Sequence, residues 1–193
     1  MIVVQADRAD LRRVQRKLGD VRSKTPQVMR DAANKTAVTA RKLLRQHAQE
    51  RYMVKAGGFN AHMKIDKATL SKPTAVVRAA DRPITLRRFN TKRDEQEGVF
   101  AKVLRRRGRM KQLTDPETGN KAFYGTGTKS GAPMVFTRVG KKRFPVIAAY
   151  GPASSKMLEV VYRGSVSEAG LKVQIEELYR RNLDQQVRRF VGQ

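Results

Sequence analysis

The sequence predicts an α+β fold, in which a mostly antiparallel small sheet is flanked by a long N-terminal helix pair and a long C-terminal helix. Three observations favour this class. Apolar residues recur every three or four positions at both ends of the chain, short β-branched segments near Pro and Gly fill the middle, and a basic extended loop interrupts them. We expect one domain over 1–193, with N-terminal helices in 1–55, a basic strand and loop region in 72–150 and C-terminal helices in 154–193.

The N-terminal region predicts a short strand followed by two helices. Asp7 stands in the N-cap position of a first helix, whose apolar residues share one face: Leu11, Val14 and Leu18. Thr25-Pro26 then restarts the chain with a capping hydroxyl and a proline at the first helical position. No Pro or Gly follows before Arg51, so we expect a long helix with a narrow, alanine-rich apolar stripe.

The middle of the chain predicts strands and turns. Residues 74–79, 84–89 and 99–104 are short β-branched or alternating segments. Residues 59–71 fit a short helix or a loop, and residues 105–131 are expected to be the least structured stretch. A hairpin is predicted over 134–148, with a basic tip at Gly140-Lys141-Lys142. Pro145 has no backbone N–H, so the second strand must lie at an edge or be broken there.

The C-terminal region predicts two helices. Ser154 or Ser155 can cap a short one. A longer helix is expected from Ser167 to Phe190, where apolar residues form one stripe and arginines gather in the second half, complementing the helix dipole.

Composition excludes several classes of protein. The chain has 42 Lys+Arg against 17 Asp+Glu, a net charge of +25, and no Cys. Disulfides and cysteine-ligated metals are therefore excluded, and two histidines argue against a zinc site. No apolar run approaches the length of a membrane span, and the N-terminus does not resemble a secretory signal. We expect synthesis in the cytosol, no membrane association and a polyanionic partner.

The sequence offers no convincing catalytic motif. The segment Gly125-x-Gly127-x-Lys129-Ser130 fails the phosphate-loop pattern, because Thr128 stands where a glycine belongs before the lysine. His47 and His62 are far apart in sequence and have no partner ligand at metal-site spacing.

An acidic cluster is the one remaining feature that could indicate an enzyme. Asp94, Glu95 and Glu97 fit local charge compensation beside Lys92 and Arg93, with a metal-dependent nuclease as the rival interpretation. We predict a protein that is not an enzyme and needs no cofactor or metal.

The basic segments carry the strongest functional signal. Residues 82–143 contain 17 Lys+Arg and 5 Asp+Glu. Arginine suits phosphate and carboxylate recognition, so this region is expected to contact either DNA phosphates or an acidic protein. With few aromatics and no known reading motif, sequence-specific readout is not supported. The candidate contact residues are Arg105, Arg106, Arg107, Arg109, Lys111, Arg138, Lys141, Lys142 and Arg143.

One segment resembles a known family. The run Thr137-Arg138-Val139-Gly140-Lys141-Lys142-Arg143-Phe144-Pro145-Val146, followed by Tyr150-Gly151-Pro152-Ala153-Ser154 and Met157-Leu158, is similar to the minor tail protein Z family of long-tailed bacteriophages, also called tail completion proteins. The specific likeness lies in 135–158, although the order of predicted elements also agrees over most of the chain. The family pattern has Ser straight after Gly-Pro, whereas Ala153 intervenes here.

The resemblance implies a structural role and carries over no catalytic residue. It implies a virion protein, made in the host bacterial cytoplasm, that forms a hexameric ring at the head-proximal end of the tail. Its partners would be copies of itself, the tail terminator, neck and tail tube proteins, and phage double-stranded DNA, whose end it would position. The alternative is a free, sequence-independent nucleic-acid-binding protein.

Overall fold

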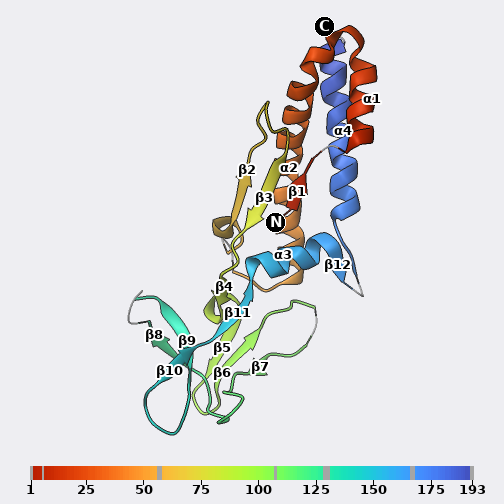
Figure 1. Ribbon diagram of the computed structural model, residues 1–193. Helices are drawn as coiled ribbons and strands as arrows, with labels where there is room; N and C mark the ends of the chain where they lie inside the picture. The colour runs from red at the N-terminus through yellow and green to blue at the C-terminus, as the bar shows by residue number, and fades with distance from the viewer. Residues whose placement is uncertain are drawn as a thin grey trace. The chain divides into compact units, whose positions relative to one another are not determined.

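The computed structural model describes residues 2–5, 7–55, 58–106, 108–127, 131–165 and 168–191. Within these residues it has long N- and C-terminal helices and several small antiparallel sheets, so the predicted α+β class is confirmed (Figure 1). The chain divides into two compact units. Unit 1 comprises Met1–Gln46, His62–Ala80 and Leu158–Gln193, and unit 2 comprises His47–Ala61 and Asp81–Met157. The single domain expected over 1–193 stays a prediction.

The first two helices begin where their capping signals predict. In α1 (Arg8–Leu18), the Asp7 carboxylate accepts a hydrogen bond from the backbone N–H of Asp10 at 2.6 Å. The helix ends at Gly19, which has a φ of 49°, and a 3₁₀ turn (η1, Gly19–Lys24) leads into α2 (Thr25–Arg51). Glycine adopts a positive φ more readily than other residues, which explains why α1 ends at this position.

Small side chains let α2 pack closely in unit 1. Ala33, Ala37 and Ala40 are fully buried. The buried Asn182 side chain of α4 (Lys172–Val191) donates to the Thr36 hydroxyl at 2.8 Å, which joins α4 to α2. Alanines on one face remove the bulk that would otherwise hold two helices apart, so the predicted narrow stripe serves as a helix-packing surface.

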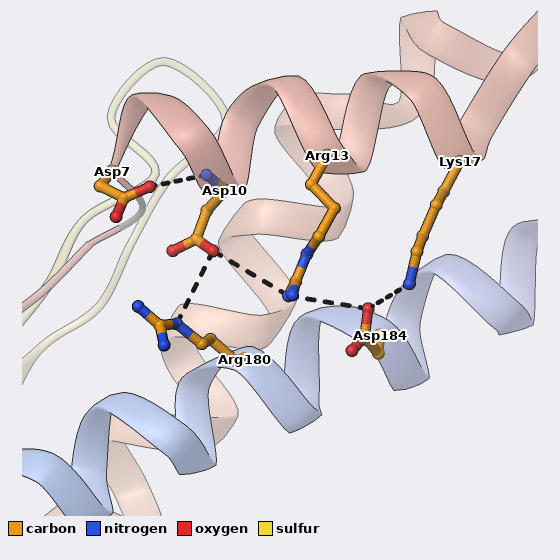
Figure 2. Close-up of polar contacts among 6 residues, drawn as sticks. All are labelled: Asp7, Asp10, Arg13, Lys17, Arg180 and Asp184. Carbon is orange, nitrogen blue, oxygen red and sulfur yellow. Dashed lines mark hydrogen bonds and ion pairs between the residues drawn. The ribbon is translucent and has the colours of Figure 1, made fainter.

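Ion pairs join α1 to α4 beside this core. Asp184 of α4 lies 2.9 Å from the Lys17 ammonium and 3.7 Å from the Arg13 guanidinium, both of α1 (Figure 2). In return, Asp10 of α1 lies 4.0 Å from Arg180 of α4. Each helix therefore supplies a carboxylate to cations of the other.

Helix α4 begins later than predicted. Two short strands, β12 (Gly164–Ser165) and β13 (Glu168–Ala169), precede it. At Gly170 the chain passes so close to the backbone of 162–164 that a Cβ would lie 2.3 Å from it. This close approach holds the segment in a hairpin, so helical geometry starts only at Lys172.

A three-stranded antiparallel sheet completes unit 1. Its order is β1 (Ile2–Val4), β3 (Ala75–Ala79), β2 (Met63–Asp66), and η2 (Asn60–His62) precedes β2. Strand β2 lies in the region for which the sequence left helix and loop open. The Asn34 side chain of α2 both donates to and accepts from the backbone of Ala68, at 3.1 and 2.7 Å, so α2 holds the chain just after β2.

Unit 2 is built from small antiparallel sheets. A two-stranded sheet pairs β4 (Pro83–Thr85) with β11 (Tyr150–Ala153). Two three-stranded sheets have the orders β5 (Asn90–Asp94), β6 (Gly98–Lys102), β7 (Lys111–Gln112) and β8 (Phe123–Thr126), β9 (Pro133–Arg138), β10 (Val146–Ala148). They pack through the fully buried side chains of Val99, Ala122 and Val135.

Some segments of unit 2 differ from expectation. The strand predicted over 84–89 stops at Thr85, because the Phe89 N–H bonds back to the Leu86 carbonyl and closes a 3₁₀ turn (η3, Leu86–Arg88). The stretch 105–131 is more ordered than predicted, since it contains β7 and β8. Helix α3 (Ser154–Arg163) begins at the expected serines. Neither serine caps it, because the buried Ser154 hydroxyl has no hydrogen-bond partner among the described residues and the Ser155 hydroxyl donates to Asp81 instead.

Candidate functional site

The basic hairpin is the best-defined candidate site. Strands β9 and β10 pair in register from Arg138↔Val146 to Phe136↔Ala148, as predicted, and β10 is an edge strand that starts directly after Pro145. The loop 139–145 joins them (teal in Figure 1), and the Val139 N–H donates to the Pro145 carbonyl at 3.3 Å. We call residues 138–146 the basic hairpin.

Its cations stand in solvent. Arg138, Lys141, Lys142 and Arg143 are all exposed. Within the part of the chain that the structure describes, the ammonium groups of Lys141 and Lys142 make no hydrogen bond or ion pair. Their charge is therefore available to a partner.

A turn on a neighbouring segment is rigid in its own right. One carboxylate oxygen of Asp115 accepts three hydrogen bonds, from the backbone N–H of Glu117 at 3.1 Å and from the N–H and hydroxyl of Thr118, each at 2.8 Å. The Gly119 N–H also donates to the Asp115 carbonyl. The bonds from Thr118 are the main cause that holds the pKa of Asp115 below its ordinary value, so the carboxylate stays charged at neutral pH.

This turn supports the base of the basic hairpin. The side-chain amide of Asn120 donates to the carbonyl of Arg138 at 3.1 Å and to that of Gly140 at 2.9 Å. Both acceptors lie where β9 passes into the loop, so the hairpin leaves the sheet in a fixed direction. Pre-ordering of this kind lowers the entropic cost of binding.

Aromatic rings lie beside two of the hairpin arginines. The Arg138 guanidinium lies 5.0 Å from the centre of the Phe123 ring, which in turn lies 6.1 Å from the Phe136 ring. The Arg143 guanidinium lies 5.8 Å from the Phe144 ring. Sequence reasoning counted few aromatics and missed this pairing, because the register that sets Phe123 opposite Phe136 is visible only in the folded sheet.

The second group of candidate contact residues lies between 105 and 111, and one of its members makes hydrogen bonds within the fold. Arg105 donates its backbone N–H to the Arg51 carbonyl at 2.9 Å and its side-chain Nε–H to the Gln49 carbonyl at 3.2 Å. These are the last carbonyls of α2, where a cation complements the helix dipole. The side chain of Arg105 therefore stabilises the end of α2.

The other members of this group differ in their surroundings. Lys111 lies in β7, opposite Ala101, and Arg106, Arg109 and Lys111 are exposed. Arg107 lies outside the described residues. Among the described residues, no hydrogen bond, ion pair or ring contact joins this group to the basic hairpin.

The acidic cluster has a structural explanation. One oxygen of Asp94 accepts hydrogen bonds from the backbone N–H groups of Gln96 and Glu97, at 2.9 and 2.8 Å, and these bonds lower its pKa. Asp94 therefore caps its own turn between β5 and β6. No group of three metal-ligating side chains gathers among the described residues, and His47 lies beside Glu50 at 3.6 Å.

Two further features of the sequence concern a glycine-rich segment and the apolar character of the helices. Gly125 lies in β8 under the Phe136 ring, while 128–130 of the same glycine-rich segment lie outside the described residues. No described helix is both long and apolar enough to cross a membrane.

Fold and site together define a basic α+β protein that presents exposed cations on a hairpin whose base is held by Asn120. Comparison with protein-family models, curated proteins and solved structures found no match.

Proposed function

We propose that this chain is a non-enzymatic structural protein of a long-tailed bacteriophage. It completes the tail at its head-proximal end, where copies assemble as a ring with tail terminator and neck or tail tube proteins. The basic hairpin then faces polyanions inside that junction, either DNA phosphates or acidic neighbours. The proposal rests on the resemblance to the minor tail protein Z family together with the geometry of the segment that carries it.

The observation that supports it best is the fold of 135–158. These residues form the basic hairpin, then β11, then the start of α3, in direct succession. Gly151 lies against the fully buried Phe89, whose ring a Cβ at that position would meet at 2.5 Å. Ser154 is fully buried at the helix start. The resembling residues thus share one structural task, which is to anchor an exposed cationic tip on a small core.

The balance of charge supports a polyanionic environment. With 42 basic and 17 acidic residues, pairing every carboxylate would still leave an excess of 25 cations. Such an excess opposes compaction and drives association with polyanions. A junction through which packaged DNA passes supplies that environment.

The test is genetic and uses a phage that encodes this chain. An amber mutation in its gene is expected to lower the infectious titre by several orders of magnitude, while heads and tails still appear in electron micrographs. Mass spectrometry of purified particles should detect the wild-type chain. A wild-type titre, or absence of the chain from particles, would contradict the proposal.

Complementation in the same phage tests the basic hairpin. A plasmid copy carrying K141Q, K142Q and R143Q should restore the titre poorly. The matched control is K64Q, K67Q and K72Q, which removes the same charge from exposed lysines of unit 1 and should restore it well.

The rival function is a free nucleic-acid-binding protein, which the unpaired hairpin cations also favour. It predicts that the chain remains with the host nucleoid and is absent from particles. Fractionation of infected cells separates the two functions.

A further inference from the structure

The basic hairpin exposes apolar side chains as well as cations. Among the described residues, four of the large hydrophobic side chains that stand in solvent fall between 139 and 150: Val139, Phe144, Ile147 and Tyr150. Phe144 is the most exposed of them, at 66%. Val139 and Phe144 lie on the basic hairpin, and Ile147 and Tyr150 follow it directly. Single exposed apolar residues are common on protein surfaces, but four within twelve residues indicate a contact surface.

The charged residues near Phe144 in the sequence are all positive. Lys141, Lys142 and Arg143 directly precede it, and no Asp or Glu occurs between Glu117 and Glu159. The tip therefore combines an apolar wedge with three positive charges and no competing carboxylate within the segment.

Duplex DNA is the partner that fits this combination best. Phosphates flank every base step, so cations on both sides of an inserted apolar side chain find partners anywhere along the duplex. An acidic protein would need a dedicated apolar pocket for Phe144 placed among its carboxylates.

We propose that the basic hairpin binds double-stranded DNA and inserts the Phe144 ring between base pairs, while Lys141, Lys142 and Arg143 contact the flanking phosphates. Unstacking a base step costs a few kcal/mol, and that cost is easier to meet when the wedge is already ordered. The bonds from Asn120 to the hairpin base provide that order. The inference rests on the proposed function in taking this hairpin as the contact element, and it names the partner and the mode of contact.

The first experiment measures DNA bending by the full-length protein. A duplex of about 30 base pairs, labelled at both ends for energy transfer, is titrated with wild-type protein, F144A and I147A. Apolar wedges kink DNA by roughly 20–90°, so the wild type should raise the transfer efficiency. F144A should abolish the bend and weaken binding on the order of tenfold, whereas I147A, which removes another exposed apolar side chain of the hairpin, should retain both.

The second experiment separates charge from insertion. For the triple variant K141Q, K142Q, R143Q, the slope of log K against log salt should fall by about 2.7, the value for three lost phosphate contacts. The K64Q, K67Q, K72Q control should change the slope less, and F144A should leave it unchanged. Equal urea midpoints for the wild type and F144A establish that folding is intact, because the Phe144 side chain is mostly exposed.

Several results would overturn the wedge. One is a duplex that stays unbent with wild-type protein, and another is an equal loss of bending and affinity for I147A and F144A. Tighter binding to a single strand than to the duplex would also contradict it. So would Phe144-dependent binding to poly-glutamate that is as tight as binding to DNA. None of these concerns the presence of the chain in particles. A protein found in virions but unable to bend DNA therefore refutes this inference alone, and a bending protein absent from virions refutes the proposed function alone.

Discussion

At the scale of single residues, the fold of unit 2 is stabilised by residues whose role becomes clear only from their contacts in the structure. Gly151 lies in β11, and its essential property is the absence of a Cβ above the Phe89 ring. Asp94 and Asp115 are charged residues in a basic region, yet each uses one oxygen to cap its own turn. These roles concern folding and positioning, not chemistry on a substrate.

The glycine role predicts a specific stability change. G151A should lower the free energy of unfolding by about 1–3 kcal/mol, because the new methyl group overlaps a buried aromatic ring. Urea denaturation followed by circular dichroism measures this. G140A is the matched control, since a Cβ there meets nothing within 4 Å, and it should change stability by less than about 0.5 kcal/mol. Equal midpoints for the two variants would contradict the packing account.

At the scale of elements, polar contacts decide which segments are held together. Helices α1 and α4 are joined by Asp184 with Lys17 and Arg13 (Figure 2), and the basic hairpin is joined to the turn 115–120 by Asn120. The first contact orders a helix pair of unit 1. The second orders the candidate site of unit 2.

The ion pairs predict a pH dependence with a definite sign. The hydrogen bond from Lys17 is the main cause that lowers the pKa of Asp184 below its ordinary value of 3.8. The stabilisation is therefore present above pH 3.8 and is lost as the pH falls through the lowered pKa of the folded state. D184N should destabilise the protein at pH 7 by up to about 1 kcal/mol, since the pair is partly exposed, and the difference should shrink progressively as the pH falls below 3.8.

E177Q is the control for that series, because it removes one exposed carboxylate of the same helix that makes no ion pair with another described residue. Unfolding curves for the three proteins at several pH values give the comparison. A D184N effect that stays constant with pH would show that the carboxylate charge is irrelevant.

The support of the basic hairpin predicts a local effect. N120A removes both bonds to the Arg138 and Gly140 carbonyls, so amide hydrogen exchange in 138–146 should accelerate about tenfold or more, while α1 and α4 remain protected. Mass-spectrometric exchange resolves the two regions. N90A is the comparison, because the Asn90 side-chain amide donates to the Met53 sulfur and makes no hydrogen bond to the basic hairpin among the described residues, so the hairpin should be unchanged. Unaltered exchange in N120A would mean that the hairpin is ordered by its strands alone.

At the scale of the whole molecule, charge dominates. The excess of 25 positive charges means that most cations lack a carboxylate partner. Repulsion among them opposes folding, whereas the few exposed ion pairs each contribute about 1 kcal/mol or less. Screening by salt weakens both effects, but repulsion is the larger one.

The free protein should therefore become more stable as salt is added. Between about 20 and 300 mM NaCl the urea midpoint should rise, because the Debye length falls and repulsion is screened. A short duplex at low salt should raise it further, since a ligand that binds the folded state stabilises it. A midpoint that falls with salt would show that attractive pairs outweigh repulsion.

The sequence by itself determined the α+β class, the cap of α1, the start of α2, and the hairpin with its cationic tip. Each of these depends on neighbours along the chain: a capping oxygen three residues from its donor, apolar residues at helical spacing, a glycine and lysines between two strands. The same local signals identified Arg138, Lys141, Lys142 and Arg143 as candidate contact residues. The structure shows them exposed, and their role in binding stays a prediction.

Only the tertiary structure decided what depends on distant contacts. It directed Arg105 toward the end of α2, placed Arg138 over Phe123, found strands β7 and β8 in the expected loop, and joined Asn120 to the base of the basic hairpin. The physical reason is that hydrogen-bond and ring partners from different segments of the chain leave no periodic trace in a sequence. Local composition therefore set the charge of the tip, and packing alone set its direction and its rigidity.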